Sequence, residues 1–142
     1  DYLVVHHMEP DHASLVAWAM EQYPAMQIVC STQAAKMLPQ FFEGIKTDGR
    51  VRIVKEGDTL PLGQHTLRFI GAPMVHWPEV LMSYEEKSGT LFSADAFGKF
   101  GALQNETDDW ACEARYPGYS NHLPPARTHA ARCCPAAGCE PV

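Results

Sequence analysis

The stretch "VVHHMEPDHAS" (residues 4–14) decides how the rest of the chain is interpreted. It follows on from "YLVV" (2–5), a short apolar run of β-favouring side chains that predicts a strand covered on both faces. The ionisable side chains come immediately afterwards: His6, His7, Glu9, Asp11 and His12. Such a concentration of imidazoles and carboxylates at the end of a buried strand requires a chemical reason.

A metal ion is the simplest reason for the pattern His7-x-Glu9-x-Asp11-His12. These side chains converge only if the backbone turns sharply, and Pro10 favours such a turn. Converging carboxylates repel one another and lose hydration, so a positive charge should lie between them. A solvated, charged loop would have a similar composition, and this alternative stays open.

Two later residues repeat the arrangement of a ligand-type side chain at a strand end. His76 follows an apolar segment in "APMVHWP", and Asp95 ends another in "LFSADAFG". Each also has a simpler explanation, since a His beside Trp77 often packs in a core and an Asp often forms a turn. With the first cluster they supply three His and three carboxylates, enough for two metal ions that share one carboxylate.

The remaining patterns predict a layered α/β fold. Leu15, Trp18 and Ala19 recur at helical spacing from Ser14 onward, and Pro24 should end that helix. The other predicted elements are a strand at 26–30, a helix at 31–42 that Pro39 should kink or end, antiparallel strands at 51–54 and 59–73 turning at Gly63-Gln64, and a hairpin at 80–95 turning at Lys87-Ser88-Gly89.

Composition limits the classes of function. The 142 residues suffice for one domain, and a formal net charge of −6 argues against nucleic acid or an anionic membrane as partner. No apolar run has the length of a membrane span, and no basic-then-apolar signal pattern is present. An odd count of five cysteines without a secretory signal predicts reduced thiols and a cytoplasmic location.

The residues "HHMEPDHAS", "VKEGDTLPLG", "APMVHWPE" and "LFSADAFG" together resemble the metallo-β-lactamase-type domain of flavodiiron proteins. The likeness runs from Asp1 to about Arg115 and implies a partial αββα sandwich. Hydrolytic members of that superfamily carry His-x-His-x-Asp-His, whereas this chain has Glu9 in place of the second His. A carboxylate adds negative charge and a hard oxygen donor, which favours iron and stabilises its ferric state.

The resemblance also implies a ligand set and an activity. His7, Glu9 and His76 would hold one iron, Asp11 and His12 the second, and Asp95 would bridge them. In the family, the two non-heme irons reduce dioxygen to water or nitric oxide to nitrous oxide. Their electrons come from FMN in a flavodoxin-like domain of a head-to-tail partner subunit, so the implied partners include that domain and a second copy.

Several family features have no counterpart in this sequence. Residues 1–115 would form a partial diiron domain that starts at the strand before the motif, and a phosphate loop for FMN is absent. The further His that the family has downstream of Asp95 is not matched, because His122 and His129 fall at other spacings. The segment 116–142 is rich in Pro and poor in large aliphatics, which predicts an irregular tail, and a shifted reading frame would explain it.

Three hypotheses therefore follow from the sequence. The first is a truncated diiron domain of an oxygen or nitric oxide reductase. The second is a hydrolase of the same fold in which a metal-bound hydroxide attacks an ester or phosphodiester. The third is a fragment without catalytic activity, because it lacks an internal electron source and one metal ligand.

Overall fold

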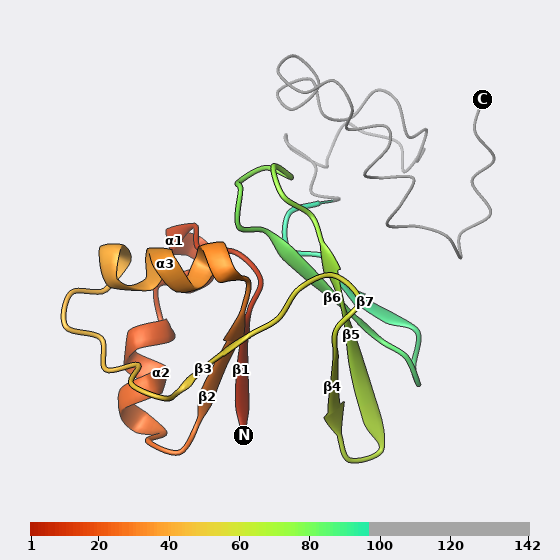
Figure 1. Cartoon of the computed structure of the whole chain (residues 1–142), viewed down its shortest axis with the longest axis horizontal. Helices are drawn as coiled ribbons and strands as arrows, with labels where there is room; N and C mark the ends of the chain where they lie inside the picture. Colours follow the sequence, from red (N-terminus) through yellow and green to blue (C-terminus); the bar gives the residue numbers. More distant parts are fainter. Residues whose placement is uncertain (97–142) are drawn as a thin grey trace, which may run out of the picture. The chain divides into compact units, whose positions relative to one another are not determined.

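The computed structural model describes residues 1–96, which begin with a parallel sheet of three strands (Figure 1). The strands lie in the order β1 (Tyr2–Val5), β2 (Gln27–Cys30) and β3 (Val51–Ile53). Helices make both crossovers: α1 (Pro10–Ala13) and α2 (Val16–Gln22) connect β1 to β2, and α3 (Thr32–Phe41) connects β2 to β3. A helical crossover returns the chain to the end of the sheet where the previous strand began, which makes the strands parallel.

A second sheet is antiparallel and is built from two hairpins. Its strands lie in chain order: β4 (Thr59–Leu62), β5 (His65–Gly71), β6 (Leu81–Glu85) and β7 (Thr90–Phe92). Gly63 and Gln64 connect β4 to β5, and Gly63 has a φ of +72°, which a two-residue hairpin turn requires. Both predicted hairpins are confirmed, although β5 ends at Gly71 and not at residue 73.

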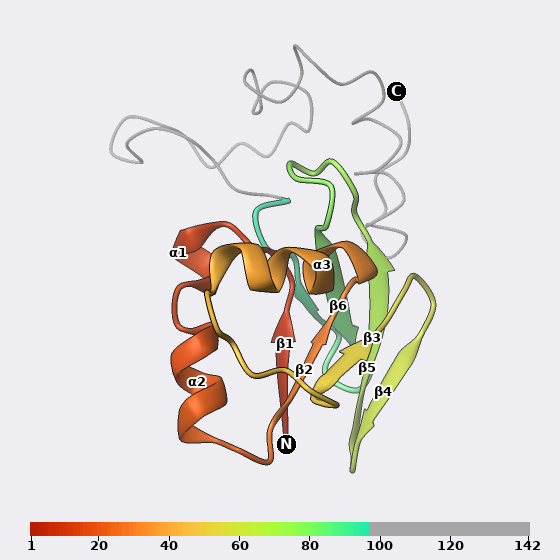
Figure 2. The ribbon, with the colours of Figure 1, turned by 60° about the vertical axis from the view of Figure 1, so that its left-hand side comes forward.

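The two sheets and the helices form three layers. The helices cover one face of the parallel sheet, and the antiparallel sheet lies on the other (Figures 1 and 2). Side chains alternate accordingly along β2: Ile28 and Cys30 pack in the cluster on the helix side, and Val29 packs with Phe69 and Leu60. Burying each large apolar side chain contributes about 1.5–3 kcal/mol. The layers agree with the predicted fold class.

The strand before the opening motif and the cap of α3 agree with the sequence interpretation. Both faces of β1 are covered, because Val5 packs on the helix side and Val4 on the other; only Tyr2 at its start is exposed. Ser31 caps α3, where its hydroxyl accepts a hydrogen bond from the Ala34 amide at 3.1 Å, as predicted.

The predicted buried face of the first helix is wrong. Val16 and Met20 are the buried residues of α2, whereas Leu15 is 68% exposed and Trp18 is 54% exposed. Two apolar stripes compete in this segment. The chain breaks between α1 and α2, and Leu15 becomes the residue that precedes α2, so the stripe through Met20 faces the sheet.

Two further expectations need correction. β3 was expected in an antiparallel arrangement, yet it pairs in parallel with β2, because α3 carries the chain back before β3 begins. Pro39 does not end α3, which continues to Phe41. A proline in this position removes one hydrogen-bond donor from the helix.

The domain boundary near Arg115, the predicted tail 116–142, His122 and His129 lie outside the described residues. Within residues 1–96, no helix has the length and apolar character that crossing a membrane requires.

Candidate metal centre

His7 and Glu9 lie in the turn that connects β1 to α1. The turn is held against β6, because the Leu81 amide donates to the His6 carbonyl at 2.9 Å. The side chain of Met8 is fully buried in the helix-side cluster, which directs its two neighbours away from that cluster. Pro10 occupies the first turn of α1, and its fixed φ suits that position.

His76 comes from the loop between β5 and β6. The loop is closed by backbone hydrogen bonds: the Ala72 amide donates to the Val80 carbonyl at 3.0 Å, and the Met74 amide donates to the Trp77 carbonyl at 2.8 Å. Strands on either side therefore fix where the loop begins and ends. His76 is carried at its tip, toward the turn after β1.

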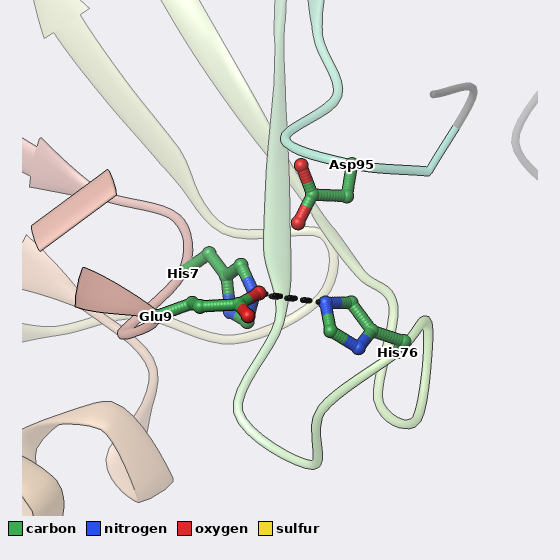
Figure 3. Close-up of side chains that lie close together, drawn as sticks. All are labelled: His7, Glu9, His76 and Asp95. Atoms are coloured by element: carbon green, nitrogen blue, oxygen red, sulfur yellow. Dashed lines mark hydrogen bonds and ion pairs between the residues drawn. The ribbon is translucent and has the colours of Figure 1, made fainter. Parts of the chain in front are cut away.

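Three ligand atoms converge between these two segments (Figure 3). His76 Nε2 lies 2.9 Å from Glu9 Oε2, His7 Nε2 lies 3.1 Å from the same oxygen, and the two imidazole nitrogens are 3.3 Å apart. The His7 side chain is fully buried, whereas about a third of the Glu9 side chain is exposed. The group is thus anchored on one side and open to solvent on the other.

Asp95 is the fourth member of this group. One ligand atom from each of the four residues lies within 4.8 Å of all the others (Figure 3). These four are among the six residues that the sequence singled out.

Hydrogen bonding to a buried carboxylate sets the orientation of His7. Its Nδ1 lies 2.7 Å from Glu79 Oε1, and this oxygen also accepts from the Met8 amide at 2.9 Å. With the hydrogen on Nδ1, the lone pair of Nε2 faces the Glu9 carboxylate. Two acceptors at 3.1 Å repel each other unless a cation or a proton lies between them.

The donor set fits a metal ion. A six-coordinate ion with bonds of about 2.1 Å separates neighbouring donor atoms by about 3.0 Å. The observed separations of 2.9, 3.1 and 3.3 Å span that value. Two imidazole nitrogens and a carboxylate oxygen are a donor set that iron accepts, and the carboxylate makes the site harder than an all-imidazole one.

Asp11 and His12 are not part of this close group. Asp11 is exposed, and its Oδ2 lies 3.6 Å from His12 Nε2. The His12 ring is nevertheless near the site, with its centroid 5.1 Å from that of His7. Their assignment to a second metal ion stays a prediction.

The first histidine of the opening stretch has a different environment. His6 Nε2 lies 2.8 Å from the Ser83 hydroxyl, and the ring stacks on Phe92. Burial, with a smaller contribution from His12, lowers the pKa of His6 from 6.5 to about 4. His6 is therefore uncharged at neutral pH and links the turn to β6.

The sequence interpretation missed Glu79. Glu79 is 1% exposed and lies at the end of the His76 loop; a lone carboxylate in the apolar run "WPEVLM" was the signal that could have found it. Trp77 is only partly buried, and its ring packs edge-on against His7 at 5.2 Å between centroids. It covers one side of the His7 and His76 rings.

Known proteins with the same fold share the flavodiiron architecture. Residues 1–126 match the family described as "ODP family beta lactamase". A putative diflavin flavoprotein A 2 from Nostoc sp. is 39% identical over 80% of this chain and 19% of its own length. A nitric oxide reductase from Moorella thermoacetica is 38% identical over 77% of this chain and 27% of its own length.

A solved structure of a flavodiiron protein is also similar to this chain. The metal-soaked Flv1 flavodiiron core from Synechocystis sp. superposes with a TM-score of 0.70 and 26% identity, over 93% of this chain and 34% of that one. The chain thus spans about a fifth to a quarter of the length of the curated relatives above. These matches confirm the resemblance to flavodiiron proteins, and the chain belongs to the ODP family of β-lactamase-like proteins.

Proposed function

We propose that this chain carries the iron-binding part of an oxidoreductase that reduces dioxygen to water, nitric oxide to nitrous oxide, or both. The observation that carries the proposal is the convergence of His7 Nε2, Glu9 Oε2 and His76 Nε2 at the end of β1. The nitric oxide reductase among the relatives supports the same class of reaction.

The proposed site would hold two non-heme irons. His7, Glu9 and His76 would bind the first, Asp11 and His12 the second, and Asp95 would be a ligand shared by both. Glu9 is the residue that favours iron over zinc, since its oxygen is a hard, anionic donor. Electrons are proposed to come from FMN in a flavodoxin-like domain or from another donor, within a homodimer located in the cytoplasm.

In this reaction the chain's own side chains would bind the irons, orient the metal ligands and exclude water. When bound, two ferrous ions would supply two electrons, enough for two molecules of nitric oxide and two protons to give one nitrous oxide and one water. His7 is fully buried and hydrogen-bonded, which fixes its ring. Glu9 and His76 lie on the partly exposed side, where a diatomic molecule can approach. Trp77 excludes water from one side of the imidazole pair.

A single-turnover experiment tests this function without an electron donor. The full chain is loaded anaerobically with ferrous iron, freed of unbound metal and mixed with nitric oxide, and nitrous oxide is measured by gas chromatography. We expect one nitrous oxide for every two irons, and strong loss of product in His76→Ala. His65→Ala removes an imidazole on the β4–β5 hairpin and is the matched control.

The hydrolase hypothesis predicts a different outcome. An iron-loaded chain that yields no nitrous oxide and consumes no dioxygen, while the zinc-loaded chain cleaves phosphodiesters, would replace the proposed function by hydrolysis. Absence of both activities in a chain that retains metal would favour the fragment without catalytic activity.

A further inference from the structure

Glu79 is a carboxylate in the interior of the protein, and its position needs an explanation. Only 1% of the residue is exposed, and its Oε2 atom has no hydrogen-bond partner within residues 1–96. Burying a carboxylate costs several kcal/mol unless positive charge or hydrogen bonds compensate it. A side chain of this kind is expected where its charge acts on a neighbouring group.

The neighbouring group is His7. Glu79 Oε1 lies 2.7 Å from His7 Nδ1 and accepts from the Met8 amide at 2.9 Å. Both groups belong to the turn after β1, so one oxygen fixes the ring and the backbone beside it. The contact joins positions 72 residues apart in the sequence.

Glu79 is itself held by α3. The Ser31 hydroxyl donates to the Glu79 carbonyl at 2.8 Å, and the Ser31 hydroxyl oxygen accepts from the Ala34 amide at 3.1 Å as the helix cap. The position of the carboxylate therefore depends on the rigid start of a ten-residue helix. Few arrangements of the Glu79 side chain satisfy all of these contacts at once.

We propose that Glu79 is a positioning residue for the metal centre, which holds His7 with its hydrogen on Nδ1 and strengthens Nε2 as a metal donor. This inference rests on the proposed function, because it assumes that His7 binds metal. A carboxylate behind a ligating imidazole fixes the ring tautomer and increases its basicity, and its loss typically lowers metal affinity 10- to 100-fold.

Two substitutions separate charge from hydrogen bonding. In Glu79→Gln, the amide oxygen can still accept from His7 Nδ1 and the Met8 amide, while the amide nitrogen replaces Oε2, which has no partner in the described part of the chain. Glu79→Leu removes both the charge and the acceptor. Glu86→Gln is the matched control, because Glu86 is an exposed carboxylate that pairs with Arg68.

The first readout needs no metal. Long-range proton–nitrogen correlation spectra of the metal-free full chain at pH 8 report the tautomer of each imidazole. We expect His7 to carry its hydrogen on Nδ1 in the wild type and in Glu79→Gln, and on Nε2 in Glu79→Leu. A wild-type His7 with its hydrogen on Nε2 would overturn the inference, whatever the protein does with metal.

The second readout is the affinity for Co²⁺, measured by competition with a chromophoric chelator. We expect about a 10-fold loss in Glu79→Gln, about a 100-fold loss in Glu79→Leu, and none in Glu86→Gln. Wild-type binding with no change in Glu79→Gln or Glu79→Leu would overturn the inference and leave the proposed function intact. A wild type that binds no metal would overturn both.

Discussion

Replacing Ser31 by alanine tests how the start of α3 stabilises the loop that carries the site. The hydroxyl makes two contacts: it accepts from the Ala34 amide and donates to the Glu79 carbonyl. Loss of a serine cap costs about 1 kcal/mol. Leaving the carbonyl of a buried residue without its donor costs about 1 kcal/mol more. We therefore expect the free energy of unfolding to fall by about 2 kcal/mol.

Two other substitutions divide that total. Ser31→Thr keeps both contacts, and Ser31→Asp keeps the cap but cannot donate to the Glu79 carbonyl. Urea unfolding of the full chain, followed by far-UV circular dichroism, gives the free energies. A loss of 2 kcal/mol lowers the midpoint by about 1 M urea if the slope is about 2 kcal/mol per M.

The expected order of stability is wild type, Ser31→Thr, Ser31→Asp and then Ser31→Ala. If Ser31→Ala lowers the free energy of unfolding by less than about 0.5 kcal/mol, about a quarter of the expected loss, the assumption that the two contacts contribute additively is refuted. An aspartate variant as stable as the threonine variant would show that the bond to the Glu79 carbonyl contributes nothing.

Three further predictions concern other parts of the described region. The Ser88 hydroxyl, with the Lys87 amide, lowers the pKa of Glu85 from 4.5 to about 2. Glu85 therefore stabilises the fold above pH 4.5, and this stabilisation is lost as the pH falls toward 2. Glu85→Gln should flatten that part of the curve of unfolding free energy against pH, and an unchanged curve would contradict the prediction. Burial raises the pKa of the Cys30 thiol to about 11. Iodoacetamide should therefore label Cys30 at least about 100-fold more slowly in native than in unfolded protein, as measured by peptide mass spectrometry. Equal labelling rates would contradict this prediction. Phe69 is fully buried between the sheets. In urea unfolding, Phe69→Ala should lower the free energy of unfolding by about 3–5 kcal/mol and Phe69→Leu by about 1 kcal/mol. Equal losses in the two variants would be evidence against tight packing around Phe69.

Much of the site could be predicted from the sequence because its residues follow strand ends. The run 2–5 ends where His7 and Glu9 begin, so the turn after β1 was visible as a change from apolar to ionisable side chains. His76 was found by the same signal after β5. Local pattern was sufficient wherever one strand and its own loop determined the position of a side chain.

Other features depended on contacts that no local pattern encodes. Glu79 contacts His7, which is 72 residues away in the sequence, and no residue next to Glu79 in the sequence indicates this contact. The buried face of α2 was decided by the break before Val16, because two apolar stripes of similar strength were available. The direction of β3 was set by the crossover through α3 and not by its own three residues.

The residues assigned to the first metal ion lie close together in the structure, whereas the two assigned to the second are outside that close group, and both assignments stay predictions. His7, Glu9 and His76 share one small volume because three strands fix the two segments that carry them. Asp11 and His12 sit on α1, a single turn of helix, with Asp11 in solvent. Spacing alone placed these two residues beside the site and did not determine which way they face.

Iron content tests the central claim most directly. The full chain is loaded anaerobically with ferrous iron, desalted and measured by elemental mass spectrometry, beside Glu9→Ala and the surface control Glu86→Ala. The account predicts close to two irons per chain in the wild type and in Glu86→Ala, and loss of iron in Glu9→Ala. Wild-type iron no higher than the Glu9→Ala background would contradict it, because the convergence of His7, Glu9 and His76 would then hold no metal.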